Sequence, residues 1–183
     1  MRRNVHEVTS AILHRERNHA KWARKGIIGM IEHQGGCVCG RVRYTVRGEP
    51  ERVTICHCTW CQRRTGTAFG VEAVFQQDRV DIAADALSIH RHFSDESGRW
   101  LDQHFCPACG TNIGITLEAV PGIRTIAAGT FDDPSWIDPA KQKFRYVYMR
   151  SAQHWSEVPD GVEQYEVHFR RRCCGAPSRQ NAP

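Results

Sequence analysis

Seven of the nine cysteines fall in three short clusters whose spacing suits a bound metal ion. Thiolates are soft, anionic ligands, and a pair one or two residues apart can hold one ion from a single turn. Glycines flank the first and third clusters, and a tight turn around sulfur needs the positive φ that glycine allows. In chain order the clusters are Cys37-Val38-Cys39, Cys56-His57-Cys58-Thr59-Trp60-Cys61 and Cys106-Pro107-Ala108-Cys109.

The number seven does not divide into closed zinc sites, because a tetrahedral structural zinc takes four sulfurs. Four plus three gives one saturated structural site and one site with an open position. Cys106 and Cys109 need two more sulfurs, and the first cluster supplies a matched pair. Cys56, Cys58 and Cys61 are then left as a local set of three ligands, whose fourth position could take water or a substrate.

Three other interpretations of the clusters are possible. His57, His104 or water could close the three-cysteine site and make both sites structural, although His57 lies between two ligands and its side chain is expected to point away. Disulfides fit poorly, because seven is odd and Cys37 and Cys39 lie only two residues apart. A thioredoxin-like pair of Cys106 and Cys109 would need a βαβ unit, which the pattern lacks. Zinc binding is the interpretation that the spacing favours.

The cysteine usage and the hydropathy agree on a compartment. No apolar run reaches the roughly 18 residues of a membrane span. The N-terminus has no apolar stretch that could serve as a signal peptide. The protein is therefore expected to be cytoplasmic, where clustered cysteines are more often metal ligands than disulfides.

The charge divides the chain into a body and two basic ends. Residues 1–29 hold seven Lys/Arg against two Asp/Glu, and residues 170–183 hold four Arg and no acid. Residues 30–169 hold fourteen Lys/Arg against eighteen Asp/Glu. We expect a flexible basic extension, one folded domain over 30–169 and a disordered basic tail. A mildly acidic body argues against a domain that grips nucleic acid.

The body has the alternation of β-strands. Val42, Tyr44 and Val46 alternate with polar residues, and Gly48 to Pro50 ends that strand. No helix is predicted. Further strands are predicted near 71–75, 87–93, 100–105, 113–117, 123–128, 144–148 and 165–169, so the fold class is mainly β.

The three clusters and their flanks resemble the glutathione-dependent formaldehyde-activating enzyme (GFA) family, which includes centromere protein V, over about residues 30–169. The segments that carry the resemblance are Gly35-Gly36-Cys37-Val38-Cys39-Gly40-Arg41-Val42-Arg43-Tyr44, Cys56-His57-Cys58-Thr59-Trp60-Cys61, Phe105-Cys106-Pro107-Ala108-Cys109-Gly110-Thr111 and, near the end, Trp155-Ser156-Glu157-Val158-Pro159-Asp160-Gly161 with Gln164-Tyr165. The resemblance implies a β-tent type fold of antiparallel sheets with zinc-knuckle turns and two zinc ions.

The resemblance also assigns roles to the clusters. It implies a structural zinc on Cys37, Cys39, Cys106 and Cys109, and a catalytic zinc on Cys56, Cys58 and Cys61. It implies a lyase that joins a thiol, glutathione in the namesake enzymes, to formaldehyde as S-hydroxymethylglutathione, or cleaves that adduct. The alternative from another class is a non-catalytic, zinc-stabilised binding module whose basic tails contact an acidic partner.

Helpers for the open site can be named only from their position beside the second cluster. Arg63 and Arg64 could meet a substrate carboxylate, and Gln62 and Thr65 could hydrogen-bond a substrate. The alternative for all four is a solvated loop.

Overall fold

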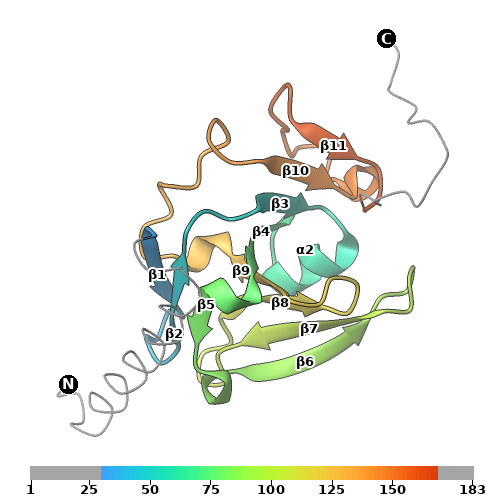
Figure 1. Cartoon of the computed structure of the whole chain (residues 1–183). Helices are drawn as coiled ribbons and strands as arrows, with labels where there is room; N and C mark the ends of the chain where they lie inside the picture. Colours follow the sequence, from blue (N-terminus) through green and yellow to red (C-terminus); the bar gives the residue numbers. More distant parts are fainter. Residues whose placement is uncertain (1–29, 169–183) are drawn as a thin grey trace, which may run out of the picture.

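The computed structural model describes residues 30–168 and shows a mainly β protein, as the alternating patterns predict (Figure 1). The basic extension predicted for 1–29 and the tail predicted for 170–183 lie outside the described residues. Within 30–168, no helix is long and apolar enough to cross a membrane.

Eleven strands, one α-helix and four short 3₁₀ turns make up the described chain. The strands are β1 (Glu32–Gly36), β2 (Arg43–Arg47), β3 (Arg52–Cys56), β4 (Gly70–Gln76), β5 (Val80–Ile82), β6 (Ser88–Phe93), β7 (Trp100–Phe105), β8 (Asn112–Leu117), β9 (Ile123–Ala127), β10 (Phe144–Val147) and β11 (Glu163–Tyr165). The helical segments are α2 (Thr59–Thr65), η1 (Gln77–Arg79), η2 (Ala84–Ala86), η3 (Ala128–Thr130) and η4 (Met149–Ser151).

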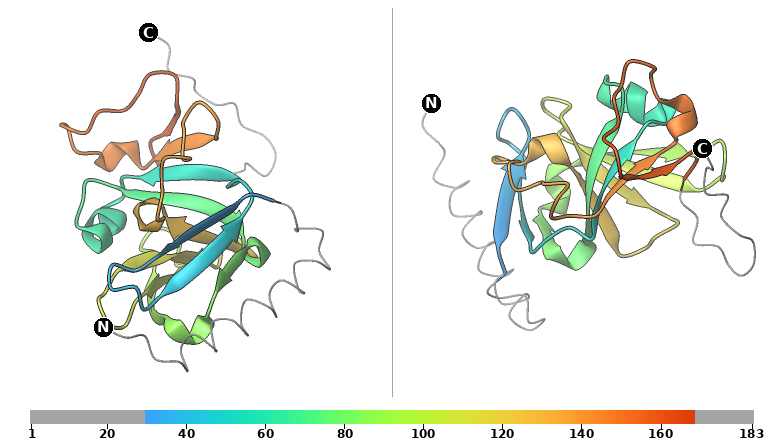
Figure 2. Two further views of the ribbon diagram at one scale, coloured as in Figure 1. Left: turned by 90° about the vertical axis from the view of Figure 1, so that its left-hand side faces the viewer. Right: turned by 90° about the horizontal axis from the view of Figure 1, so that it is seen from above.

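The strands form a small sheet, β1-β2-β5, and a large sheet, β11-β10-β3-β4-β9-β8-β7-β6. The small sheet stands at one side of the large one, and α2 lies away from it, between β3 and the β7–β8 pair (Figures 1 and 2). The pairings are antiparallel except that β10 runs parallel to both β3 and β11. The two parallel pairs differ from the antiparallel sheets that the sequence predicts, because a parallel partner is reached by a long crossover that leaves no local signal.

The core lies where the inner face of the small sheet meets the large one. Val42 and Val46, which the period-two pattern placed on one face, are fully buried. They share one apolar cluster with Phe75 of β4, Ile113 of β8 and Ile126 of β9. This core fixes the β1–β2 turn against the large sheet, and that turn carries the first cysteine pair.

The last strand ends earlier than the alternation predicts. It spans Glu163–Tyr165 and pairs with β10, while Val167 is exposed and Phe169 lies outside the described residues. The prediction that the body has no helix is wrong, because α2 lies directly after the start of the second cluster.

His104 is a buried histidine that we expect to make the stability of the fold sensitive to acid. Its ring is 5% exposed, and its Nε2 lies 2.9 Å from Thr116 Oγ1. Burial, together with the positive charge of Arg124, lowers the pKa of His104 from 6.5 to about 4. The unfolded chain therefore binds more protons below pH 6.5, so the stability is full above that pH and falls as the pH drops towards 4.

We expect the free energy of unfolding to fall between pH 7 and pH 5 by as much as about 2 kcal/mol through this residue. Urea titrations at both pH values measure it. His104→Gln keeps a hydrogen-bonding group beside Thr116 but cannot titrate, so its stability should change less over the same range. Equal losses in the two proteins would contradict this account.

Two cysteine clusters that could hold metal ions

The first and third clusters meet at one place, although 67 residues separate Cys39 from Cys106. Each cluster occupies a tight turn that the backbone N–H of a following glycine closes onto the carbonyl of the first cysteine. Gly40 N–H donates to the carbonyl of Cys37 at 3.0 Å, and Gly110 N–H donates to that of Cys106 at 2.9 Å. Both glycines have positive φ, +76° and +73°, as expected for a backbone that folds around sulfur.

The four sulfurs of these two turns lie within 4.8 Å of one another. The Cys37 and Cys39 sulfurs are 3.4 Å apart, and the Cys39 and Cys106 sulfurs are 3.8 Å apart. A tetrahedral ion with zinc–sulfur bonds of about 2.3 Å separates its ligands by about 3.8 Å. The sulfurs therefore fit a single zinc ion, and the backbone N–H of Val42 donates to Cys37 Sγ as an outer hydrogen bond.

The second cluster stands alone at the end of a central strand. The sulfurs of Cys56, Cys58 and Cys61 lie within 4.8 Å of one another. Among the described residues, no histidine, cysteine or carboxylate joins them as a fourth ligand. Cys56 ends β3 between Gly70 of β4 and Val147 of β10.

Helix α2 places the other two sulfurs. Cys58 is its N-cap, and the thiol sulfur accepts a hydrogen bond from the Cys61 backbone N–H at 3.3 Å. Gly66 ends the helix with φ +67°. The Cys56 thiol and the Cys61 thiol, as hydrogen-bond partners, hold the pKa of Cys58 well below that of a free thiol. A lowered thiol pKa favours the thiolate, which is the form that binds a cation.

The loop that carries these sulfurs is tied down from outside. Gln62 Nε2 donates to the carbonyl of His57 at 2.6 Å and to that of Ser151 at 2.8 Å. Gln62 Oε1 in turn accepts from Gln153 at 2.8 Å. The side-chain amide of Gln62 therefore holds the loop to η4. It does not hydrogen-bond a substrate, which is the role suggested by its position in the sequence.

His57 points away from the neighbouring sulfurs, as its place between two ligands predicts. The ring is fully buried between Phe69 and Tyr146, with ring centroids 5.2 Å and 6.1 Å away. Burial lowers the pKa of His57, so the imidazole is neutral. Neither ring nitrogen has a hydrogen-bond partner among residues 30–168, and His57 does not join the sulfur cluster.

Aromatic and charged side chains surround this second cluster. Trp60 stacks on His92 of β6 with ring centroids 5.1 Å apart. Tyr148 adopts the left-handed conformation, φ +60° and ψ +41°, and is alone in this among the described non-glycine residues. Burial, with smaller contributions from the negative charges of Glu96, Cys56 and Cys58, raises the pKa of Tyr148 to about 12.

The two arginines that follow the cluster differ completely. The Arg63 residue is exposed, whereas the side chain of Arg64 is 3% exposed and forms an ion pair with Glu72. Arg64 is therefore neither a solvated loop residue nor free to meet a substrate carboxylate. The pairing of Glu72 with Arg64 is not among the sequence predictions. A single acid inside the apolar strand Val71–Phe75 could have indicated a buried ion pair.

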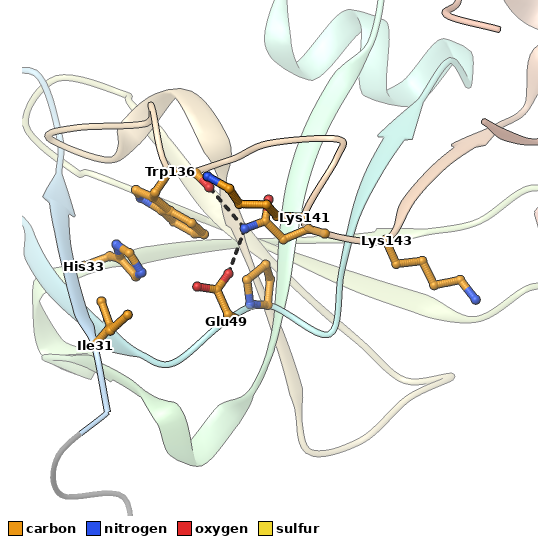
Figure 3. A pocket seen from close by; sticks show the side chains of 8 residues that line it. Ile31, His33, Glu49, Trp136, Lys141 and Lys143 are labelled. Atoms are coloured by element: carbon orange, nitrogen blue, oxygen red, sulfur yellow. Dashed lines mark hydrogen bonds between the residues drawn. The ribbon is translucent and has the colours of Figure 1, made fainter. Parts of the chain in front are cut away.

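The structure also has an open depression of about 570 Å³ at the other end of β3 (Figure 3). His33 and Trp136 stack along its wall with ring centroids 3.8 Å apart, and Gln142 donates to Glu49 at 2.7 Å. Pro50, just before β3, belongs to this depression, whereas Cys56 ends the strand. It contains no cysteine and is separate from both sulfur clusters.

The chain is similar in sequence to one family of known proteins. Residues 32–147 match the family model described as "Glutathione-dependent formaldehyde-activating enzyme" (GFA). Proteins from Aspergillus flavus and Aspergillus oryzae are each 22% identical over 138 residues, covering 73% of this chain and 69% of the relative. One from Pyrenophora teres f. teres is 23% identical over 142 residues, covering 72% and 73%. All three bear the name "Putative glutathione-dependent formaldehyde-activating enzyme".

A crystal structure of a Rhodobacter sphaeroides protein is also similar, with 19% identity and a TM-score of 0.45, covering 57% of this chain and 94% of that one. The family match spans β1 to β10 and includes all seven clustered cysteines, and these form two groups that could each hold a metal ion, compatible with zinc. The chain belongs to the glutathione-dependent formaldehyde-activating enzyme family.

Proposed function

We propose that this protein is a zinc-dependent carbon–sulfur lyase that adds a thiol, glutathione or a close analogue, to formaldehyde and cleaves the same adduct. The observation that carries the proposal is the set of three sulfurs, Cys56, Cys58 and Cys61, which no fourth side-chain ligand completes within residues 30–168. Catalytic zinc sites keep such a position open, whereas structural sites are closed. The relatives' names supply the thiol and the aldehyde.

The two cysteine groups are assigned different roles in this proposal. Cys37, Cys39, Cys106 and Cys109 would hold a structural zinc, and the second cluster would hold the catalytic one. Zinc bound at the second cluster would supply a Lewis acid that lowers the pKa of an entering thiol from about 8.5. The role of the protein is to keep the three sulfurs in one loop, tied through Gln62 to η4, so that this position stays fixed.

The reaction is a balanced addition. The thiol sulfur forms a bond to the carbonyl carbon, and the π electron pair moves to the oxygen. The oxygen takes up the proton that the thiol releases, which yields a hemithioacetal, and lysis is the reverse. Holding the thiolate beside the aldehyde makes a bimolecular step local, which can lower its barrier by several kcal/mol.

The expected result is faster exchange between formaldehyde and its glutathione adduct when the protein is present. Exchange NMR measures the rate directly, and it must be compared with a protein-free sample because the uncatalysed reaction also runs. Zinc-loaded protein should contain about two ions per chain, one of which a mild chelator or added glutathione removes readily. Two equally resistant ions and an unchanged exchange rate would instead favour a zinc-stabilised binding module.

A further inference from the structure

Arg64 is a buried cation directly behind the second cluster. It lies on α2 three residues after Cys61, and its side chain is 3% exposed. A buried guanidinium is costly unless anions pair with it. Arg64 is therefore expected to have negatively charged groups beside it.

A carboxylate and a cysteine sulfur meet one end of this guanidinium. Arg64 Nη2 forms the ion pair with Glu72, whose side chain is 5% exposed, and it also lies 3.9 Å from Cys61 Sγ. The guanidinium carbon lies 5.1 Å from the centre of the Trp60 ring. Nε and Nη1 are buried without a hydrogen-bond partner in the described chain, so Glu72 alone does not satisfy the guanidinium.

Neighbouring strands hold this pair rigidly. Thr125 Oγ1 on β9 donates to Glu72 and accepts from the backbone N–H of Ile115 at 3.0 Å. Gly70 leaves the space in which Arg64 meets Cys61, since a Cβ there would lie 3.1 Å from Arg64 Nη2 and 3.5 Å from Cys61 Cβ. The contact between Arg64 and the sulfur is therefore built into the sheet.

The net charge of a loaded second cluster suggests a role for the contact between Arg64 and Cys61. Three thiolates and a divalent cation leave one net negative charge, and a substrate thiolate adds a second in a partly buried place. We propose that Arg64 is a positioning residue, which orients the Cys61 thiolate and supplies the positive charge that lets the second cluster hold a metal ion and receive a substrate thiolate. The inference rests on the proposed function, because it needs a metal ion on Cys56, Cys58 and Cys61.

Cobalt titration tests the inference without any assay of activity. The labile ion is removed with a mild chelator, and Co²⁺ is added while thiolate-to-cobalt absorption is followed. Arg64→Gln should weaken Co²⁺ binding about 10- to 100-fold and shift this absorption. Arg64→Lys, which keeps the charge, should recover part of the affinity. Arg63→Gln is the matched control and should bind as the wild type does. With Co²⁺ kept in excess so that the second cluster stays loaded against removal by the thiol, Arg64→Gln should need more glutathione than the wild type to change this absorption.

A second variant covers the risk that Arg64→Gln leaves Glu72 unpaired and the chain unfolded. Arg64→Gln combined with Glu72→Gln replaces the ion pair by two neutral amides and should also bind Co²⁺ more weakly. If the folded single or double variant had the Co²⁺ affinity and the absorption spectrum of the wild type, the role of Arg64 would be refuted and the proposed function would still stand. A wild-type chain that takes up no second ion would refute the proposed function as well, and this result is seen before any variant is compared.

Discussion

The Cys106→Ser variant is expected to lose the native fold or to unfold at much lower denaturant concentration than the wild type. Cys106 is fully buried, and its sulfur joins the β7–β8 turn to the β1–β2 turn across 67 residues. Structural zinc sites contribute about 10–16 kcal/mol of binding free energy, which is comparable with the ~5–15 kcal/mol net stability of a domain. Loss of one ligand should therefore remove most of the stability.

Circular dichroism during urea unfolding and the zinc content of the purified protein measure this effect. Cys109→Ser alters an exposed cysteine of the same group of four. If the four sulfurs share one structural ion, this variant should be destabilised too, and a buried hydroxyl could not be the cause. Cys173→Ser makes the same chemical change outside the three clusters and outside the described residues, and it should behave as wild type. A soluble Cys106→Ser protein that holds both ions would show that the assignment of the four ligands is wrong.

The features predictable from sequence are those with a local signature. The strands with strict alternation appear where Val42, Tyr44 and Val46 indicated, because one buried face leaves a period-two pattern. The Cys-x-Cys and Cys-x-x-Cys turns likewise carry their own glycines. Their meeting in space followed from counting ligands, since neither pair can complete a tetrahedral site alone.

Helix α2 could not be predicted from periodicity. It has seven residues, and its first positions are Thr59, Trp60 and Cys61, none of which is a strong helix former. What stabilises it is local and unusual, a cysteine sulfur as the N-cap and Gly66 at the C-terminus. The parallel pairing of β10 with β3 is equally hidden, because Val147 and Cys56 are 91 residues apart.

The surroundings of the second cluster depend on tertiary placement. Arg63 and Arg64 are equivalent in the sequence, and the turn of α2 alone decides that one is exposed and the other pairs with Glu72. Tyr148 comes to the cluster only through the β10 pairing, and its positive φ leaves no sequence signal. Residues beside a site are thus harder to predict than its ligands, because no motif records which strand will lie next to them.

The Cys58→Ser variant is expected to keep its fold and to lose one ion together with the acceleration of formaldehyde exchange. The N-cap geometry of Cys58 lets serine replace it without loss of the helix. Cys58 accepts the Cys61 backbone N–H, and serine is among the preferred N-cap residues, so α2 should persist. We expect an unfolding free energy within about 2 kcal/mol of wild type and an exchange rate reduced about 100-fold or more towards the uncatalysed rate.

Cys58→Ala separates the two roles of this position. It removes the cap as well as the sulfur, so it should lose about 1 kcal/mol of stability relative to Cys58→Ser while showing the same loss of metal and of exchange. Zinc content, urea unfolding and exchange NMR on the three proteins give the comparison. If Cys58→Ser retained two ions and full activity, the second cluster would not be the reacting site. If it lost both ions and unfolded, the group of four sulfurs and the group of three would not be independent. The division of seven sulfurs into a closed site and an open one would then be wrong.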